Sequence, residues 1–180
     1  YSLPFDPPFG NWRVFEDAPE RGEIVVFTNP KQGNLDTIKR VIGLPGDRIE
    51  VKGGRPIING VMVPRTKVGE LSYTNYKGES VTVIEFEETL PGGVTYRVYE
   101  DKGYKQLRDI SLAVVPAGHF FMMGDNRDHS IDSRGDLGAI PMSIIVGRAE
   151  AISFSLYDCD QGKAISCTMG LPFGRFFTGL

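Results

Sequence analysis

The sequence predicts a mainly β fold built from short antiparallel strands, with few short helices. Three observations support this class. Glycine (22) and proline (12) supply 34 of the 180 residues, which favours many turns. Runs of β-branched and aromatic residues are short and are separated by turn dipeptides. Helix signals are few, and the best candidate covers residues 141–145.

The first strands are predicted over two β-branched segments. Residues 23–28 read Glu-Ile-Val-Val-Phe-Thr, follow Gly22 and are typical of a buried strand. A second strand covers residues 37–42. It ends at Leu44-Pro45-Gly46-Asp47, where proline and glycine stand in the order that a type II turn requires.

Shorter strands follow, joined by hairpin turns. Gly53-Gly54 and Asn59-Gly60 are typical of two-residue hairpin loops, and Pro91-Gly92-Gly93 separates a longer pair of strands. The remaining expected strands cover residues 48–51, 56–59, 61–63, 81–87, 94–99, 119–123 and 144–154.

The length fits one domain that carries a sizeable insertion. Residues 52–114 are more charged and richer in turns than their surroundings, and the densest polar motifs, 39–47 and 124–134, flank them. We therefore expect a discontinuous catalytic or binding core of residues 1–51 and 115–180, with residues 52–114 forming an inserted β-rich subdomain.

Composition argues against several classes of protein. With 20 Lys and Arg against 23 Asp and Glu, the formal charge is −3, so a basic nucleic-acid-binding surface is not expected. No run of about 18 apolar residues exists that would span a bilayer as a helix. Cys159 and Cys167 are the only cysteines and are remote from both histidines, which argues against a zinc site. We expect no metal and no cofactor; a disulfide and two free thiols both remain open.

Lys39 and Arg40 are adjacent within the second expected strand. Strand alternation points them to opposite faces, so one cation must lie near apolar residues unless the strand is an exposed edge. A desolvated lysine has a lowered pKa and can act as a general base. The alternative is an edge strand that two charges guard against aggregation.

Residues 124–134, named here the polar loop, read Gly-Asp-Asn-Arg-Asp-His-Ser-Ile-Asp-Ser-Arg. Opposed charges at this density suit a loop held by its own ion pairs and hydrogen bonds, which could fix a hydroxyl against a catalytic group. The alternatives are a solvated loop and a calcium loop, although the spacing does not fit the EF-hand pattern. His129 could titrate, but no role follows for it from the sequence.

Together these segments resemble the bacterial type I signal peptidases, membrane-anchored serine proteases that remove signal peptides after export. The combination of Lys-Arg…Gly-Leu-Pro-Gly-Asp with Gly-Asp-Asn-Arg…Ser-x-Asp-Ser-Arg is highly specific. The matching segments, in family order, are Arg21-Gly-Glu-Ile-Val-Val-Phe27, Ile38-Lys-Arg-Val-Ile-Gly-Leu-Pro-Gly-Asp47, Ile58-Asn-Gly60, Val115-Pro-Ala-Gly-His-Phe-Phe-Met-Met-Gly-Asp-Asn-Arg127, Ser130-x-Asp-Ser-Arg134 and Val146-Gly-Arg-Ala149.

The resemblance implies a signal-peptidase-like β fold and a Ser–Lys dyad. Lys39 matches the general base, and Ser130 matches the loop serine that orients this lysine. Ile38 matches an apolar wall of the pocket that accepts the small side chain before the scissile bond, so Ala-x-Ala-like sites are expected. The positions that brace the loop match Asp125, Asn126, Arg127, Asp132 and Arg134.

The resemblance further implies signal-peptide-bearing preproteins as substrates and a membrane surface as a partner. The catalytic domain would lie on the periplasmic side of the bacterial inner membrane. Two aromatic segments, residues 5–15 and 171–177, are candidates for contact with lipid.

The chain departs from the family pattern at the nucleophile. That serine belongs to a Ser-Met-x-Pro-Thr-like motif upstream of the Gly-Glu-Ile-Val-Val-Phe strand, and no Ser-Met pair occurs here. We therefore expect the chain to begin after this motif and to be inactive alone. Two alternatives remain: a related Ser–Lys processing peptidase, or a non-catalytic homologue that binds exported polypeptides.

Overall fold

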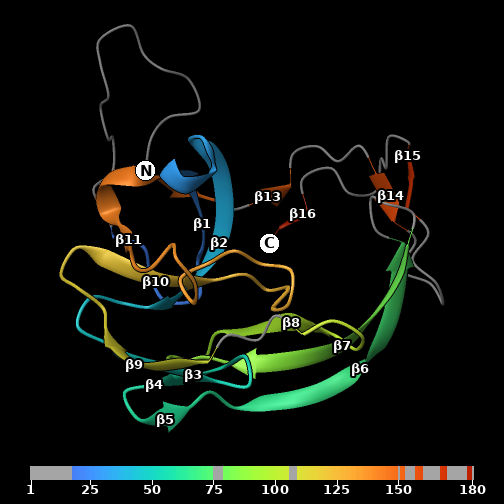
Figure 1. Cartoon of the computed structure of the whole chain (residues 1–180), viewed down its shortest axis with the longest axis horizontal. Coiled ribbons are helices and arrows are strands. Elements are labelled where there is room, and N and C mark those ends of the chain that lie inside the picture. The colour runs from blue at the N-terminus through green and yellow to red at the C-terminus, as the bar shows by residue number, and fades with distance from the viewer. Residues whose placement is uncertain are drawn as a thin grey trace, which may run out of the picture.

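A computed structural model of the chain describes residues 18–74, 79–105 and 109–149, and the backbone of four short strands beyond them. The described part is mostly β, as predicted, and its strands pair antiparallel (Figure 1). Among the described residues, no helix is long and apolar enough to cross a membrane.

A five-stranded sheet holds the segment around Lys39. Its order is β11-β10-β2-β1-β12, so β2 is the central strand. Arg40 on β2 lies opposite Met123 of β10, and Lys39 lies opposite Val25 of β1. The alternative of a guarded edge strand is therefore wrong. The strands are β1 (Ile24–Asn29), β2 (Leu35–Gly43), β10 (His119–Met123), β11 (Ile140–Pro141) and β12 (Ile145–Arg148).

Two further sheets are built from the middle of the chain. One has four strands in the order β5-β4-β3-β9, and the other has three in the order β6-β7-β8 (Figure 1). Their bounds are β3 (Arg48–Lys52), β4 (Arg55–Ile58), β5 (Val61–Met62), β6 (Arg65–Thr74), β7 (Ser80–Thr89), β8 (Thr95–Asp101) and β9 (Ile110–Val114).

The remaining elements are short. Where a helix was expected over residues 141–145, the chain forms one 3-10 turn, η2 (Met142–Ile144), and a second such turn, η1 (Pro30–Gln32), follows β1. The strands described by backbone alone are β13 (Ala151–Ile152), β14 (Tyr157–Cys159), β15 (Cys167–Met169) and β16 (Thr178–Gly179). Cys159 lies opposite Cys167 in the β14–β15 pair. The two aromatic segments expected to contact lipid lie outside the described residues.

The predicted turns are confirmed by backbone conformation. Gly46 has φ 88°, as the third residue of a type II turn requires. Asn59 and Gly60 both have positive φ, 52° and 83°, which is the type I′ hairpin. The turn at Asn59-Gly60 fixes the register of β4 against β5, whereas the turn at Gly46 leads the chain from the sheet of β2 into the sheet of β3.

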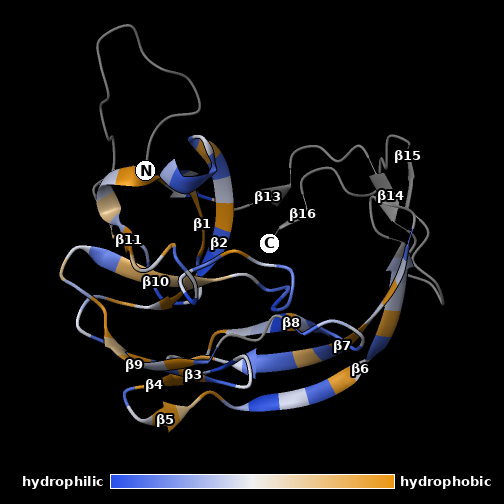
Figure 2. Cartoon of the chain, viewed as in Figure 1, coloured by the Kyte–Doolittle hydropathy of each residue, from blue (hydrophilic) through white to orange (hydrophobic). Residues whose placement is uncertain are grey.

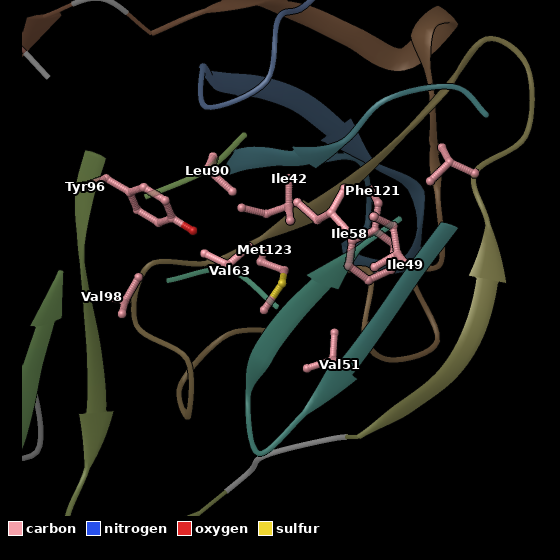
Figure 3. Packing of buried hydrophobic residues seen from close by; sticks show 11 residues of the cluster. Ile42, Ile49, Val51, Ile58, Val63, Leu90, Tyr96, Val98, Phe121 and Met123 are labelled. Atoms are coloured by element: carbon pink, nitrogen blue, oxygen red, sulfur yellow. The ribbon is translucent and has the colours of Figure 1, made fainter. Parts of the chain in front are cut away.

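Two hydrophobic clusters form the core. One lies against the five-stranded sheet and includes Val25, Phe27 and Val41. The other joins the three sheets: Figure 3 shows Ile49, Ile58 and Phe121 gathered at one end and Tyr96 and Val98 of β8 at the other. The second cluster therefore packs the strands that carry the polar loop against the β6-β7-β8 sheet.

Several strands were missed by the sequence prediction, and β6 and β9 are the longest of them. Strand β6 contains charged residues and a register shift next to Gly69, so it lacks the alternation that marks a half-buried strand. Figure 2 shows hydrophilic and hydrophobic residues mixed along β6 and β7. Strand β9 exposes Leu112 and Val114.

The expected strand over residues 144–154 is interrupted after β12 (Ile145–Arg148). The division into a core and an inserted subdomain of residues 52–114 stays a prediction. The strands at both ends of that range, β3 and β9, are paired with each other.

We expect Gly60→Ala to lower the free energy of unfolding by about 1–2 kcal/mol, because an L side chain is strained in the left-handed region. The space around Gly60 is open, so the effect isolates backbone conformation. Gly69→Ala is the matched control, since that site is equally open but has no positive φ. Urea denaturation measures the free energy of unfolding of both variants. Equal decreases in Gly60→Ala and Gly69→Ala would contradict the turn assignment.

Candidate active site

A cavity of about 230 Å³ lies between strand β2 and the polar loop. It is lined from β1 and β2 by Ile24, Ile38, Lys39 and Arg40, and from the polar loop by Gly124, Asp125, Asn126, His129 and Ser130. The structure thus brings together the two motifs that the sequence singled out, although about 85 residues separate Lys39 from the loop. It also places Ile38, which is half exposed, at the same opening.

Lys39 is largely withdrawn from water at the centre of the sheet. Burial lowers the pKa of its ammonium below the ordinary value for lysine, because desolvation disfavours the charged form. Asp132 and Asp125 act in the opposite direction, and Arg134 adds to the lowering. Burial prevails, so the balance favours a neutral amine at a lower pH than for a solvated lysine.

Arg40, the neighbouring cation, is held on the loop side by Asp125. Its Nε donates to Oδ1 at 2.9 Å and its Nη2 to Oδ2 at 2.8 Å, a bidentate pair. The guanidinium also donates to the carbonyl of Gly22 at 2.7 Å and lies 4.5 Å above the ring of Tyr96. Arg40 is therefore a structural link between β2 and the polar loop.

Asp132 and Arg134 brace the far end of the polar loop. The Asp132 carboxylate accepts from Arg134 Nε at 2.8 Å and Nη2 at 2.7 Å, and from the backbone of Gly124 at 2.9 Å. Burial alone would raise the pKa of Asp132, but these donors hold it below its ordinary value. Ser133 adds a link to β10, since its Oγ accepts from Met122 N at 2.9 Å.

Arg127 extends from the loop into the core and binds Glu88 of β7. The side chains of both residues are fully buried. Arg127 Nη1 donates to Glu88 Oε1 at 3.0 Å and to the carbonyl of Gly54 at 2.7 Å, and Nη2 donates to the hydroxyl of Tyr96 at 3.1 Å. Arg65 also binds Glu88, at 2.6 Å. The loop is thus fastened to the β6-β7-β8 sheet by a buried ionic network.

Ser130 packs closely against Gly124. A Cβ atom at residue 124 would lie 2.2 Å from Ser130 Oγ, so any side chain there would displace the serine. Among the described residues, the buried Ser130 hydroxyl and the side-chain oxygen of Asn126 have no hydrogen-bond partner. Ser130 therefore presents an uncommitted hydroxyl at the cavity that Lys39 also lines.

Several residues around the site were missed at the sequence level. Glu88, Tyr96 and Asp101 come from β7 and β8 and contact the loop only through the tertiary fold. A signal for Glu88 was present: alternation places it on the face of Ile84 and Phe86, and an acid on an apolar face needs a buried partner. Gly124 carried no signal beyond its place in the motif.

Calcium binding by the loop is not supported by the geometry. Of the candidate ligands Asp128, Asp132 and Asp136, Asp128 accepts from the backbone of Asp101 and Asp132 is paired with Arg134. No group of acidic, cysteine or histidine side chains among the described residues could hold a metal ion. The solvated-loop alternative is wrong, because Arg127, Asp128, Asp132 and Arg134 are buried.

A family model and curated relatives agree on one family. Residues 9–154 match the family model described as signal peptidase, peptidase S26. The chain is 40% identical over 164 residues to a signal peptidase I of Rickettsia typhi and 40% identical over 167 residues to that of Rickettsia akari, matches that cover 86% of this chain and 60% of each relative. It thus spans less than two thirds of the length of these relatives. A crystal structure of a signal peptidase I from Enterococcus faecalis matches 74% of this chain and 97% of its own, with 27% identity and a TM-score of 0.43.

We expect Arg127→Met to lower the free energy of unfolding by about 3–5 kcal/mol, because it leaves the Glu88 carboxylate buried with one arginine fewer. Arg97→Met is the matched control: the Arg97–Glu87 pair is half exposed, and its loss should cost about 1 kcal/mol or less. Chemical denaturation gives both values. If Arg127→Met lowers the free energy of unfolding as little as the control does, the buried pair is not needed for stability.

The stability of the chain should fall in acid partly through Asp132. Its pKa is lower in the folded state than the unfolded value near 3.8, so its stabilisation is present above pH 3.8 and is lost as the pH falls through the folded pKa. Asp132→Asn should flatten the dependence of unfolding free energy on pH between about 2 and 5. Asp36→Asn, at an exposed carboxylate, is the control; identical pH slopes in Asp132→Asn and the parent would refute this role.

Proposed function

The chain belongs to the signal peptidase family, peptidase S26, and from this premise we propose that it carries the general base and supporting loop of a serine endopeptidase. The endopeptidase removes N-terminal signal peptides from exported proteins at Ala-x-Ala-like sites by a Ser–Lys dyad. Its catalytic domain works on the periplasmic side of the bacterial inner membrane. We assign no residue of this chain as the nucleophile.

The burial of Lys39 beside a cavity is the observation that carries the proposal. A general base must be neutral at the working pH, and a solvated lysine is not. Burial lowers the pKa of Lys39, and the cavity gives its amine access to a substrate and to an attacking hydroxyl. A lysine kept from water merely by packing would not open onto a cavity.

The chemistry uses one proton, which Lys39 takes and returns. The neutral amine accepts the proton of the serine hydroxyl as its oxygen attacks the carbonyl carbon before the scissile bond. The resulting ammonium gives that proton to the departing amine as the C–N bond breaks. Water then repeats the sequence on the acyl-enzyme, with Lys39 as base again, and frees the serine.

Ser130 acts in this proposal by orienting Lys39. Its hydroxyl lines the same cavity and is uncommitted, so it can accept a hydrogen bond from the lysine amine. The absence of a side chain at Gly124 gives Ser130 this position. Asp125, Arg127, Asp132 and Arg134 support the loop through the ion pairs described above, and Asn126 lines the cavity beside them.

Ile38 contributes to selectivity for small side chains. It is half exposed at the cavity, next to Ile24, where it can contact the substrate residue before the scissile bond. A shallow apolar wall accepts a methyl group and rejects larger groups by overlap, which fits alanine.

In the longest reading frame that contains the chain, we expect Lys39→Ala and Lys39→Arg both to abolish cleavage, by at least about 1000-fold in kcat, and Lys39→Ala to do so with little loss of stability. Arginine keeps the charge but does not deprotonate, so it cannot serve as a base. The control is Lys67→Ala, at a half-exposed residue paired with Glu70. Cleavage of a preprotein with an Ala-x-Ala site, followed by mass spectrometry, is the readout. Activity of Lys39→Arg near that of the parent would remove Lys39 from this role.

The function itself is tested by expressing the chain alone and within the longest reading frame that contains it. Cleavage by the longer protein, at the residue after Ala-x-Ala, supports a signal peptidase. Cleavage of other processing sites in preference to Ala-x-Ala would favour a related Ser–Lys peptidase. Preprotein binding without cleavage by either form would overturn the enzymatic proposal in favour of a non-catalytic homologue.

A further inference from the structure

Strand β8 lies directly against the polar loop, and the two share backbone hydrogen bonds. Tyr99 N donates to Asp125 O at 2.9 Å, and Arg127 N donates to Tyr99 O at 2.9 Å. These bonds form an isolated parallel bridge between Tyr99 and Asn126. The first half of the polar loop is therefore held against β8 by backbone hydrogen bonds.

The contact between β8 and the loop ends in a side-chain pair. His129 Nε2 lies 2.8 Å from Asp101 Oδ2 at the end of β8. The imidazole stacks on the ring of Tyr104, with centroids 5.4 Å apart and planes 25° from parallel. Asp101 is itself oriented, because its Oδ1 accepts from Gly103 N at 2.7 Å and from Tyr104 N at 3.0 Å. A fixed acceptor and a flat aromatic surface thus define where His129 lies.

His129 immediately precedes Ser130 and lines the same cavity. On the other side of Ser130, the loop is fixed by Asp132 and Ser133 through their bonds to Gly124 and Met122. The serine hydroxyl has no hydrogen-bond partner of its own among the described residues. Its position is therefore determined by these two anchors and by its packing against Gly124.

We propose that His129 is a positioning residue: with Asp101 and Tyr104 it fixes the loop on the N-terminal side of Ser130, and so sets the Ser130 hydroxyl against Lys39. This inference rests on the proposed function for the roles of Ser130 and Lys39. It also gives the β6-β7-β8 sheet a function, since Asp101 belongs to β8. The hydrogen bond, rather than the charge, is the operative feature, because either a neutral or a charged imidazole can donate from Nε2 to a carboxylate.

The charged neighbours of His129 are consistent with a fixed hydrogen bond. Asp101 is its direct partner, and Asp128 binds the backbone of Asp101 at 2.8 Å. Lys105 lies 3.6 Å from Asp128 and 3.5 Å from Glu100. Burial alone would raise the pKa of Asp101, but His129 and two backbone donors hold it below its ordinary value. Asp101 thus stays an ionised acceptor through the neutral range.

The test compares His129→Ala, His129→Gln and Asp101→Ala, with His119→Ala as the matched control. His119 is the other histidine; its ring Nδ1 lies 2.9 Å from the carbonyl oxygen of Ala117, and it does not line the cavity. Glutamine keeps a donor where histidine has Nε2, whereas alanine removes it. The kinetics of cleavage are measured with the protein that the longest reading frame encodes. The pKa of Lys39 is measured by NMR in the 180-residue chain.

We expect His129→Ala to lower kcat about 10- to 100-fold with KM nearly unchanged, because a displacement near 1 Å is enough for such a loss. His129→Gln should recover most of kcat. Adding Asp101→Ala to His129→Ala should lower kcat little further, since each change alone already removes the His129–Asp101 hydrogen bond. The pKa of Lys39 should move toward its ordinary value in His129→Ala, as a displaced loop admits water.

Two outcomes would overturn the proposal. The first is that kcat and the pKa of Lys39 in His129→Ala equal those in the control His119→Ala. The second is that His129→Gln loses as much kcat as His129→Ala. Absence of cleavage by the parent would refute the proposed function instead. In that case the Lys39 pKa still decides whether His129 fixes the loop, because it is read in the 180-residue chain without substrate.

Discussion

The withdrawal of Lys39 from water is the constraint on which the rest of the site depends. A buried ammonium is destabilised, but a nearby carboxylate would restore its charge. Asp125 and Asp132 both act on Lys39 in that direction. Each is bound by an arginine, Asp125 by Arg40 and Asp132 by Arg134, which neutralises much of its attraction for the lysine. Pairing with Arg40 of β2 and with Arg134 of the polar loop is therefore what allows two acids to lie near the general base that we propose for Lys39.

The loop owes its position to strands of two sheets rather than to its own sequence alone. Arg40 holds it from β2, Met122 from β10 through Ser133, and Glu88 from β7 through Arg127. A buried ion pair is costly to desolvate, so the Arg127–Glu88 pair is better understood as fixing one arrangement than as adding stability. The middle of the chain, which the sequence predicted as an inserted β-rich subdomain without a role, thereby acts as a support for the site.

Sequence patterns predicted the parts of the fold that depend on local chemistry. Strand His119–Met123 has its predicted bounds, and the turns at Gly46 and Gly60 have the predicted conformations, because short apolar runs and glycine act within a few residues. Strand β6 was missed because its stability comes from pairing with β7, which its own residues do not signal.

The site was predictable where one motif contained both partners, and not elsewhere. Asp132 and Arg134 are two residues apart, so their pairing could be expected from the loop alone. Arg40 pairs with Asp125, which lies 85 residues further along the chain, and His129 pairs with Asp101, which lies 28 residues before it. Contacts between such distant residues follow from the topology of the fold. The family resemblance selected Lys39 and Ser130, whereas Glu88, Gly124 and Asp101 acquired a role only once the strands were placed.

The account is tested most directly by the pKa of Lys39 itself. Titrating the 13C-labelled lysine ε-carbons by NMR, with Lys39→Arg identifying the signal, measures it in the folded chain. The account predicts a value below the 10.5 of a solvated lysine, because burial outweighs the two neutralised carboxylates. A value at or above 10.5 would mean that Lys39 is an ordinary cation held by Asp125 and Asp132, and it would contradict a role as general base.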